Sequence, residues 1–252
     1  MIEKTAIVAG AARGIGLATT KQFLAEGRRV AMIDRDAEAL LHEAGQLDGV
    51  IPVICDVSQP DQVAAMMDQC ARQLGRIDAL VNNAGVADFG PIEDTTFARW
   101  REVMATNLDG VFLCSQAAIP HLRQARGAIV NIASISGLRA STLRVAYGTS
   151  KAAVIHLTQQ QAAELGEYGI RANCVAPGPV RTKLAMAVHS QDIIDAYHDA
   201  IPLNRYGEAR EIAEAIVFLC SDKASFVSGQ TLAVDGGFDA TGVGLPALRR
   251  EN

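Results

Sequence analysis

The sequence lacks the marks of several broad classes of protein. It contains no long basic run, and its 28 acidic residues outnumber 23 lysines and arginines to give a net charge of -5. This balance argues against nucleic acid or an anionic membrane surface as the main partner. No stretch reaches the roughly 18 apolar residues that a membrane span needs, and the first ten residues, MIEKTAIVAG, do not resemble a signal peptide. We therefore expect a soluble, cytoplasmic protein.

Disulfide and metal-binding patterns are also missing. The five cysteines are an odd number, are widely spaced and include no Cys-x-x-Cys pair, which predicts reduced thiols. The five histidines show no metal-ligand spacing, so no metal site is expected.

The sequence has enough apolar material for one sizeable core, because 49% of its 252 residues are hydrophobic. Short β-branched runs alternate with longer helical patterns, which is typical of βαβ units in a parallel sheet. The expected strands are Thr5–Val8, Arg29–Ile33, Val50–Ile54, Ala79–Val81, Ala128–Ile132, Arg171–Val175 and Thr231–Val234. The expected helices include Gly14–Glu26, Asp61–Leu74, Phe97–Gln124, Tyr147–Glu167 and Glu208–Ser221. We predict an α/β fold with a doubly wound, Rossmann-type parallel sheet of about seven strands flanked by helices, in a single domain over residues 1–252.

Two segments do not follow this alternation. Residues 183–202 form an extra, mixed helical insertion between a strand and the next helix. They are either an amphipathic helix that simply packs on the domain or a lid that closes over the substrate. Residues 239–252 have no clear period and are expected to form a loosely ordered tail or a subunit contact.

The first expected strand ends in a glycine-rich turn, Gly10-Ala11-Ala12-Arg13-Gly14-Ile15-Gly16. Glycines allow a tight turn, and the N–H groups that open the following helix can bind a pyrophosphate, although an ordinary strand–helix turn can look the same. Asp34 ends the next strand, 18 residues past Gly16. A carboxylate there binds the adenosine ribose hydroxyls and repels a 2′-phosphate, which favours NAD over NADP. Alternatively, Asp34 only caps a helix, and Arg13 or Arg35 could pair with a phosphate.

Polar and small residues follow the next two expected strands. Asp56 and Val57 come after the third strand, and Asn83, Ala84 and Gly85 come after the fourth. The carboxyl ends of parallel strands border the crevice in which open α/β sheets bind ligands. Asp56 could meet an adenine amino group there, although Asn, Asp and Gly are also ordinary turn residues.

Ser134, Tyr147 and Lys151 form the strongest constellation. Tyr147 and Lys151 are four residues apart and share one helix face, and Ser134 follows the fifth strand at the same sheet edge. A free tyrosine has a pKa of about 10, and a neighbouring ammonium and a positive nicotinamide ring should lower this pKa. Tyr147 is then a general acid/base for the interconversion of an alcohol and a carbonyl, with Ser134 as a donor to the same oxygen. In isolation, such a Tyr–Lys pair is more often solvated or structural.

Together these motifs resemble the classical short-chain dehydrogenase/reductase (SDR) family from about Thr5 to Phe238. The resemblance implies a catalytic tetrad of Asn107, Ser134, Tyr147 and Lys151. The cofactor contacts that it implies are Gly10, Arg13, Gly14, Ile15, Gly16, Asp34, Asp56, Val57, Asn83, Ala84, Gly85, Tyr147, Lys151, Pro177, Gly178, Val180 and Thr182. The sequence departs from the family at Ala9, where a threonine usually tethers the glycine turn through its hydroxyl.

The resemblance also implies roles for these residues. Lys151 would bind the nicotinamide ribose and depress the pKa of Tyr147. Asn107 would hold a water that relays protons to the lysine, and Val180 and Thr182 would contact the nicotinamide carboxamide. The implied enzyme is an NAD-dependent oxidoreductase for a small secondary alcohol, of polyol, sugar alcohol or hydroxy acid type, and a homotetramer built through two long helices and the last strand. Alternatives are a 3-oxoacyl-type carbonyl reductase and a non-catalytic NAD-binding regulatory protein, and the intact tetrad argues against the second.

Four residues are candidates for substrate contacts, namely Ser136, Arg144, His189 and Tyr197. Arg144 lies three residues before the tyrosine of the tetrad and is either solvated or a ligand for an acidic substrate. His189 and Tyr197 belong to the 183–202 insertion and favour a small hydroxylated substrate over a long acyl chain.

Overall fold

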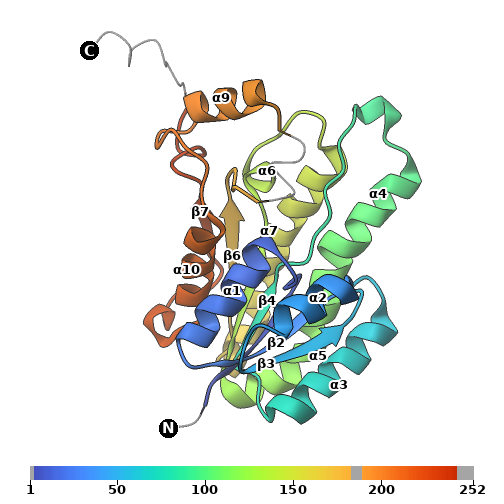
Figure 1. The fold of residues 1–252 in the computed structure, drawn as a ribbon, viewed down its shortest axis with the longest axis vertical. Helices are drawn as coiled ribbons and strands as arrows, with labels where there is room; N and C mark the ends of the chain where they lie inside the picture. The colour runs from blue at the N-terminus through green and yellow to red at the C-terminus, as the bar shows by residue number, and fades with distance from the viewer. Residues whose placement is uncertain (1–2, 183–188, 243–252) are drawn as a thin grey trace.

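The centre of the computed structural model, which describes residues 3–182 and 189–242, is one seven-stranded parallel sheet (Figure 1). The strand order is β3-β2-β1-β4-β5-β6-β7, so the direction in which strands are added reverses between β1 and β4. This order confirms the predicted doubly wound, Rossmann-type fold. The strands are β1 (Thr5–Ala9), β2 (Arg29–Asp34), β3 (Val50–Ile54), β4 (Ala79–Asn82), β5 (Ala128–Ile132), β6 (Arg171–Pro177) and β7 (Thr231–Val234).

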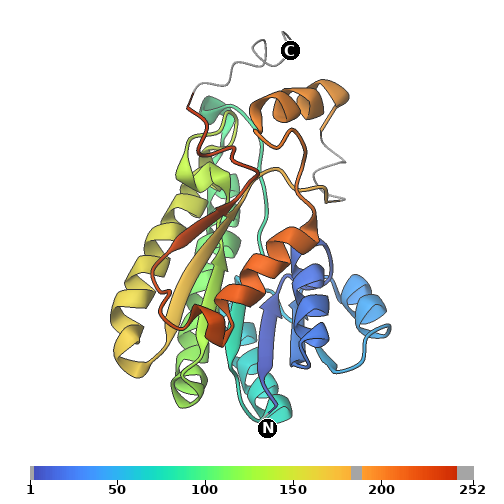
Figure 2. The same cartoon turned by 90° about the vertical axis from the view of Figure 1, so that its left-hand side faces the viewer.

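Helices cover both faces of the sheet, so that central strands such as β1 and β5 are buried along their whole length. Figure 2 separates the two layers, with α1 and α10 on one side of the strands and α5 and α7 on the other. The first layer is formed by α1 (Gly14–Ala25), α2 (Ala37–Ala44) and α10 (Ala209–Leu219), around Phe23, Leu40 and Ile216. The second layer is formed by α3 (Pro60–Leu74), α5 (Gly110–Ala125) and α7 (Val145–Leu165), around Met66, Leu122 and Leu165. No helix within the described ranges has both the length and the apolar character needed to cross a membrane.

The expected helix over residues 97–124 is wrong as a single element. α4 (Phe97–Met104) is followed by a π-helical turn, Ala105–Asp109, before α5 begins at Gly110. Local periodicity could not show this break, because it depends on contacts of Asn107 and Gly110 with segments far away in the sequence. Strands β1, β2, β4 and β6 also extend one or two residues further than expected at their carboxyl ends.

The 183–202 insertion contains a helix, α9 (Gln191–Ala200), which begins at the capping residue Ser190. In Figure 1, α9 lies beyond the carboxyl ends of the strands, and the short α6 (Ile135–Leu138) lies at the same end of the molecule. Residues 183–188 of the insertion and residues 243–252 of the tail lie outside the described residues.

A chain of buried polar side chains joins the middle of the sheet to the second helical layer. The Nδ2 group of Asn82 donates to Ser115 Oγ at 2.9 Å and to Asn131 Oδ1 at 2.8 Å. The Nδ2 group of Asn131 donates in turn to Thr158 Oγ1 at 2.9 Å and to Gln161 Oε1 at 2.8 Å. Because all five side chains are buried, these bonds replace hydrogen bonds to water and fix the relative positions of β4, β5 and α7.

Replacing Asn131 with alanine should lower the free energy of unfolding by about 2–4 kcal/mol, because Gln161 loses its buried partner and Asn82 loses one of two. Urea unfolding followed by circular dichroism at one fixed protein concentration measures this change. Gln160→Ala is the matched control, because Gln160 lies next to Gln161 on α7 but is exposed. It should change the free energy of unfolding by less than about 0.5 kcal/mol. Equal unfolding midpoints for the two variants would contradict this role of the network.

Candidate active site

The glycine turn after β1 is held against the turn after β4 by the side chain of Asn83. Its Nδ2 group donates to the carbonyl oxygens of Gly10 at 2.9 Å and Ala9 at 3.2 Å. A Cβ at Gly10, where φ is +69°, would lie 2.8 Å from the Cα of Ala84, and a Cβ at Gly16 would overlap the Gly10 carbonyl oxygen. Both positions therefore require glycine. The tether that a threonine at position 9 would make is made here by Asn83.

The first turn of α1 offers free backbone donors beside this turn. The N-cap residue Arg13 makes no side-chain capping hydrogen bond to the helix, because a guanidinium has no acceptor for the helix N–H groups, and it is paired with Asp36. Uncapped N–H groups and the helix dipole together form an anion-binding site. This arrangement fits the pyrophosphate of a dinucleotide, with Gly14, Ile15 and Gly16 at its base.

Asp34, the predicted ligand of the adenosine ribose, lies against the glycine turn. Its Oδ2 accepts a hydrogen bond from the N–H of Ala12 at 3.0 Å, and its Oδ1 accepts one from the N–H of Asp36 at 3.0 Å. The carboxylate is thus fixed against the glycine turn. Asp34 is not the cap of α2, because that role belongs to Asp36, whose Oδ1 accepts from Ala39 N at 3.1 Å.

Both arginines that could attract a 2′-phosphate lie beside carboxylates. Arg13 is paired with Asp36, and Arg35 Nη1 lies 3.8 Å from Asp56 Oδ2. The sequence did not lead us to predict Asp36 as the cap of α2 or the partner of Arg13. An aspartate directly before a helix is nevertheless a recognisable capping signal. Backbone and Arg13 hydrogen bonds lower the pKa of Asp36 below its ordinary value.

Asp56 and Val57, the predicted adenine contacts, lie on the turn after β3. Asp56 Oδ1 accepts hydrogen bonds from the Ser58 backbone at 3.0 Å and from the Ser58 hydroxyl at 2.7 Å. The buried Val57 packs on Gly110, where a Cβ would lie 2.8 Å from Val57 Cγ2. The close approach of these two residues fixes the start of α5 beside the turn after β3.

Ser134, Tyr147 and Lys151 lie together at the carboxyl end of β5. Ser134 and Lys151 are buried, and Lys151 Nζ donates to the carbonyl oxygen of Ile132 at 2.8 Å. The same Nζ lies 5.7 Å from the centre of the Tyr147 ring. The Tyr147 phenol is hydrogen-bonded with Ser134.

The expected lowering of the Tyr147 pKa is wrong for the protein without a bound ligand. Burial raises the pKa of Tyr147, and the hydrogen bond with Ser134 and the charge of Arg144 only oppose this rise. Burial also lowers the pKa of Lys151 to about 8, although its Nζ donates a hydrogen bond to the Ile132 carbonyl oxygen. The spacing of Tyr147 and Lys151 predicts the effect of the lysine charge, but the desolvation of both groups depends on the folded structure.

Asn107, on the π-helical turn, clamps the loop after β4. Its Oδ1 accepts from the N–H of Val86 at 2.8 Å, and its Nδ2 donates to the Val86 carbonyl at 2.9 Å and to Ser150 Oγ at 3.1 Å. A Cβ at Gly85 would lie 3.3 Å from Asn107 Oδ1 and 3.5 Å from Lys151 Nζ. Gly85, Asn107 and Lys151 are therefore neighbours, although 66 residues separate the first from the last.

The segment after β6 borders the glycine turn from the other side. Gly178 allows close packing on β7, because a Cβ there would lie 2.7 Å from the Cβ of Asp235. Val180 is buried, and the N–H of Thr182 donates to the Val180 carbonyl at 2.8 Å. A Cβ at Gly14 would lie 3.7 Å from Thr182 Cγ2, so the predicted nicotinamide segment, Pro177–Thr182, meets the predicted pyrophosphate turn.

The four substrate candidates fall into two groups. Ser136 is buried and donates its N–H to Ser134 Oγ at 3.2 Å, while the Arg144 guanidinium lies over the Tyr147 ring. His189 and Tyr197 lie in an aromatic cluster whose other members are His198, Tyr206 and Phe238.

In that cluster, His189 Nδ1 is hydrogen-bonded to the Tyr206 hydroxyl at 3.0 Å, and the His189 and Tyr197 rings stack with centres 5.5 Å apart. Burial raises the pKa of Tyr206 to about 12. Tyr206 and Phe238 were missed because sequence spacing does not predict contacts between separate loops. The cluster joins α9 to the segment before α10, which carries Tyr206, and to the segment after β7, which carries Phe238.

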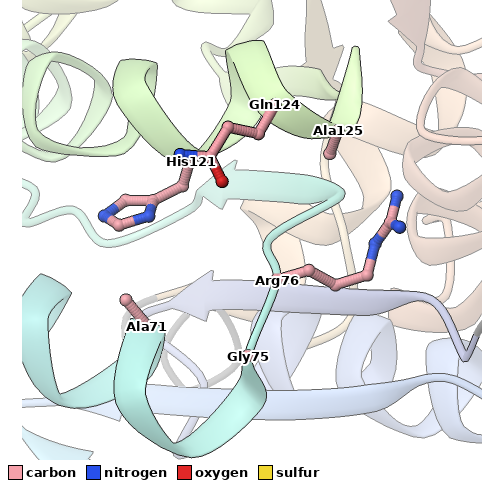
Figure 3. Close-up of a pocket in the computed structure, with 6 residues that line it drawn as sticks. All are labelled: Ala71, Gly75, Arg76, His121, Gln124 and Ala125. Atoms are coloured by element: carbon pink, nitrogen blue, oxygen red, sulfur yellow. The ribbon is translucent and has the colours of Figure 1, made fainter.

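A cavity of about 210 Å³ lies elsewhere, between the ends of α3 and α5. Figure 3 shows its lining residues, with His121 and Arg76 on opposite sides. Arg76 is held by Asp78, which precedes β4, so the cavity lies at the amino end of the sheet and not beside Tyr147. Within the described ranges, no three His, Cys, Asp or Glu side chains form a metal-ligating group.

The fold and this site define an oxidoreductase of the dinucleotide-binding type, and comparison with known proteins identifies its family. The family model described as enoyl-(acyl carrier protein) reductase matches residues 10–239. The chain is 39% identical over 240 residues to meso-2,3-butanediol dehydrogenase of Serratia marcescens, covering 94% of this chain and 95% of that one. It is 40% identical over 243 residues to the 3-oxoacyl-(acyl-carrier-protein) reductase FabG of Staphylococcus epidermidis, covering 94% and 99%.

A solved structure agrees with these relatives. The crystal structure of levodione reductase superposes with a TM-score of 0.91 at 32% identity and covers 95% of this chain and 98% of that one. The chain belongs to the short-chain dehydrogenase/reductase family. It is an oxidoreductase that acts on CH–OH groups, of a family whose dehydrogenases use a nicotinamide cofactor.

The low pKa of buried Lys151 predicts how stability depends on pH. Below about pH 8, folding buries a charged ammonium, whereas between pH 8 and 10.5 the folded protein releases this proton and the unfolded chain keeps it. The contribution of Lys151 to the free energy of unfolding should therefore rise with pH across this window, by up to roughly 3 kcal/mol.

Urea unfolding of the wild type and of Lys151→Met, measured from pH 7.5 to 10.5, tests this expectation. The difference between the two proteins isolates Lys151 from other titrating groups, such as the buried cysteines. Parallel stability curves across the whole range would contradict the assigned pKa.

Proposed function

We propose that this enzyme is an NAD(H)-dependent dehydrogenase that interconverts a small secondary alcohol and its ketone, with Tyr147 as general acid/base. The observation that carries the proposal is the meeting of Ser134, Tyr147 and Lys151 at the sheet edge that also holds the glycine turn. The relative from Serratia marcescens is named for such an alcohol, meso-2,3-butanediol, and this supports the proposal.

The cofactor would be held by residues at the carboxyl ends of β1, β2, β3, β4 and β6 and by two residues of α7. The first turn of α1 would bind the pyrophosphate through Gly14, Ile15 and Gly16, with Gly10 and Arg13 beside it. Asp34 would bind the adenosine ribose, and Asp56 and Val57 the adenine. On the other side, the residues near the nicotinamide and its ribose would be Asn83, Ala84, Gly85, Tyr147, Lys151, Pro177, Gly178, Val180 and Thr182. When bound, the nicotinamide ring supplies the hydride acceptor or donor of the reaction.

The protein's own groups would move the proton. In alcohol oxidation, the Tyr147 oxygen takes the proton of the substrate hydroxyl, and in ketone reduction the phenol returns it. The Ser134 hydroxyl donates a hydrogen bond to the same substrate oxygen and stabilises the charge that develops there. The raised pKa of Tyr147 in the free protein keeps the phenol protonated, which is the state that ketone reduction requires.

Lys151 and Asn107 would support this transfer. A charged Lys151 favours the phenolate form of Tyr147 during alcohol oxidation and binds the nicotinamide ribose. Both polar groups of the Asn107 side chain contact Val86, so its first task is to fix the loop that borders Lys151. A proton relay to Lys151 through a water near Asn107 completes the proposal.

A second candidate is a 3-oxoacyl-type carbonyl reductase, because FabG of Staphylococcus epidermidis is as similar as the alcohol dehydrogenase. The aromatic cluster around His189 and Tyr197 supports a small substrate, since the polar groups of these two rings suit a hydroxylated molecule better than a long acyl chain. Turnover of acetoacetyl-CoA compared with turnover of acetoin, each with NADH, separates the two candidate functions.

We also propose a cytoplasmic homotetramer. The exposed apolar side chains of Phe112 on α5 and Leu232 on β7 support the subunit contacts of such an assembly.

Tyr147→Phe should reduce turnover by about 10²–10⁴-fold, because it removes the proton-transferring oxygen and leaves the cofactor residues in place. Steady-state absorbance of NADH measures turnover, and quenching of protein fluorescence by NADH measures cofactor affinity, which should change little. Tyr168→Phe, at the opposite end of α7, is the matched control and should keep wild-type activity. Near-normal turnover of Tyr147→Phe would reject this mechanism.

The wild type should prefer NAD over NADP in kcat/KM, because Asp34 repels a 2′-phosphate and Asp36 neutralises Arg13. Asp34→Ser should narrow the preference. Adding Asp36→Asn keeps a helix cap and frees Arg13, so NADP use should rise by roughly a further 10–100-fold.

Arg13→Gln in that double variant should abolish the second gain and serves as its control. A wild-type enzyme that uses both cofactors equally well would disprove the assigned role of Asp34.

A further inference from the structure

The Arg144 guanidinium lies beside Tyr147 and has no ion-pair partner among the residues that the structure describes. Its Cζ is 5.6 Å from the centre of the Tyr147 ring and 4.4 Å from the centre of the Phe89 ring. No carboxylate in residues 3–182 or 189–242 lies within the 4.0 Å ion-pair distance of Arg144. The residue is half-buried, so solvent stabilises its charge only in part.

The groups that surround Arg144 do not neutralise it. Asp88, on the loop that carries Phe89, is paired with Arg99, whose Nε lies 3.0 Å from Asp88 Oδ1. His189, next to the N-cap of α9, cannot neutralise a guanidinium, because its ring is either uncharged or positive, and burial together with the charge of Arg144 lowers its pKa. Phe89 and Tyr147 present only ring faces, which attract a cation without satisfying its N–H donors.

The backbone around Arg144 is held in a fixed, uncommon conformation. Leu143 has a φ of +62°, in the left-handed region that non-glycine residues rarely adopt. The N–H of Gly90 donates to the Leu143 carbonyl at 3.0 Å, and the N–H of Gly148 donates to the Arg144 carbonyl at 2.7 Å. The Leu143 side chain is 50% exposed, which is unfavourable for leucine. The loop thus holds an apolar residue in solvent and the neighbouring cation over the catalytic ring.

We propose that Arg144 binds a carboxylate of the substrate, so that the enzyme acts on a small hydroxy acid and the matching keto acid. This inference rests on the proposed function and narrows its substrate class from secondary alcohols in general. A guanidinium offers paired N–H donors that match the two oxygens of a carboxylate. When the reacting carbon lies at the Tyr147 hydroxyl, a carboxylate bound to Arg144 is only a few bonds from that carbon. This excludes substrates with a long chain between the ketone and the carboxylate.

Matched pairs of ketones that differ only in charge test the proposal. The substrates are 4-oxopentanoate and 5-oxohexanoate, each compared with its methyl ester, and acetoin is the small uncharged reference. We expect the wild type to prefer one keto acid over its ester in kcat/KM by roughly 10–100-fold. Pentanoate should inhibit acetoin reduction competitively, and pentanamide should not.

Variants then locate the anion site. Arg144→Gln should raise KM for the keto acid by roughly 10–100-fold, leave KM for the ester unchanged and abolish the inhibition by pentanoate. Arg144→Lys should recover only part of the affinity, because an ammonium cannot form the paired contact. Arg123→Gln is the matched control, since Arg123 also stacks on an aromatic ring, 4.0 Å from the centre of Tyr168, and is remote from Tyr147.

The outcomes are distinct. A wild type that reduces acetoin or the esters but not the acids overturns the anion site and leaves the proposed function intact. A loss of kcat in Arg144→Gln that is equal for acid and ester also overturns it, because the charge then acts only on Tyr147. Inactivity toward every ketone in the panel, with either NADH or NADPH, would instead count against the proposed function. The wild-type measurements decide the question even if Arg144→Gln does not fold.

Discussion

The contact between the turns after β1 and β4 governs the geometry of the whole active site. Asn83 binds the Ala9 and Gly10 carbonyls, and this contact is possible only because Gly10 and Gly16 have no side chain. The same turn continues to Gly85, which borders both Asn107 and Lys151. A single close approach therefore links the N-terminus of α1, proposed to bind the pyrophosphate, to the buried Lys151, proposed to bind the nicotinamide ribose.

Desolvation acts on the ionisation of Tyr147 and Lys151 before any ligand binds. Burial raises the pKa of Tyr147 and lowers that of Lys151 to about 8, so the lysine keeps its charge at neutral pH and the tyrosine stays a phenol. The phenolate form of Tyr147 is favoured only once further positive charge or hydrogen-bond donors reach its oxygen. In the proposed mechanism, proton transfer would in this way be coupled to the binding of cofactor and substrate.

The fold was predictable because its signals are local or periodic. All seven strands are apolar runs bounded by turn residues, and the glycine turn and the Tyr–Lys spacing can be read directly from the sequence. The features that were missed depend on contacts between distant segments. The π-helical turn at Asn107 needs the loop at Val86, and the partners of His189 and Tyr197 come from loops that follow in the chain. The pKa of Tyr147 was misjudged for a related reason, since burial is a property of the folded protein and not of residue spacing.

The pairing of arginines differs between the two ends of the crevice, and this difference separates what each end can bind. At the end that carries Asp34, Arg13 is held by Asp36 and Arg35 lies near Asp56, so the field around Asp34 is dominated by carboxylates. At the other end, Arg144 is held over Tyr147 by aromatic faces that carry no net charge. Under the proposed function, the first end would bind a dinucleotide without a 2′-phosphate, and the second end a ligand that brings its own negative charge. Because the two ends are joined through the Asn83 and Gly85 turn, the cofactor and such a substrate would meet over the same tyrosine.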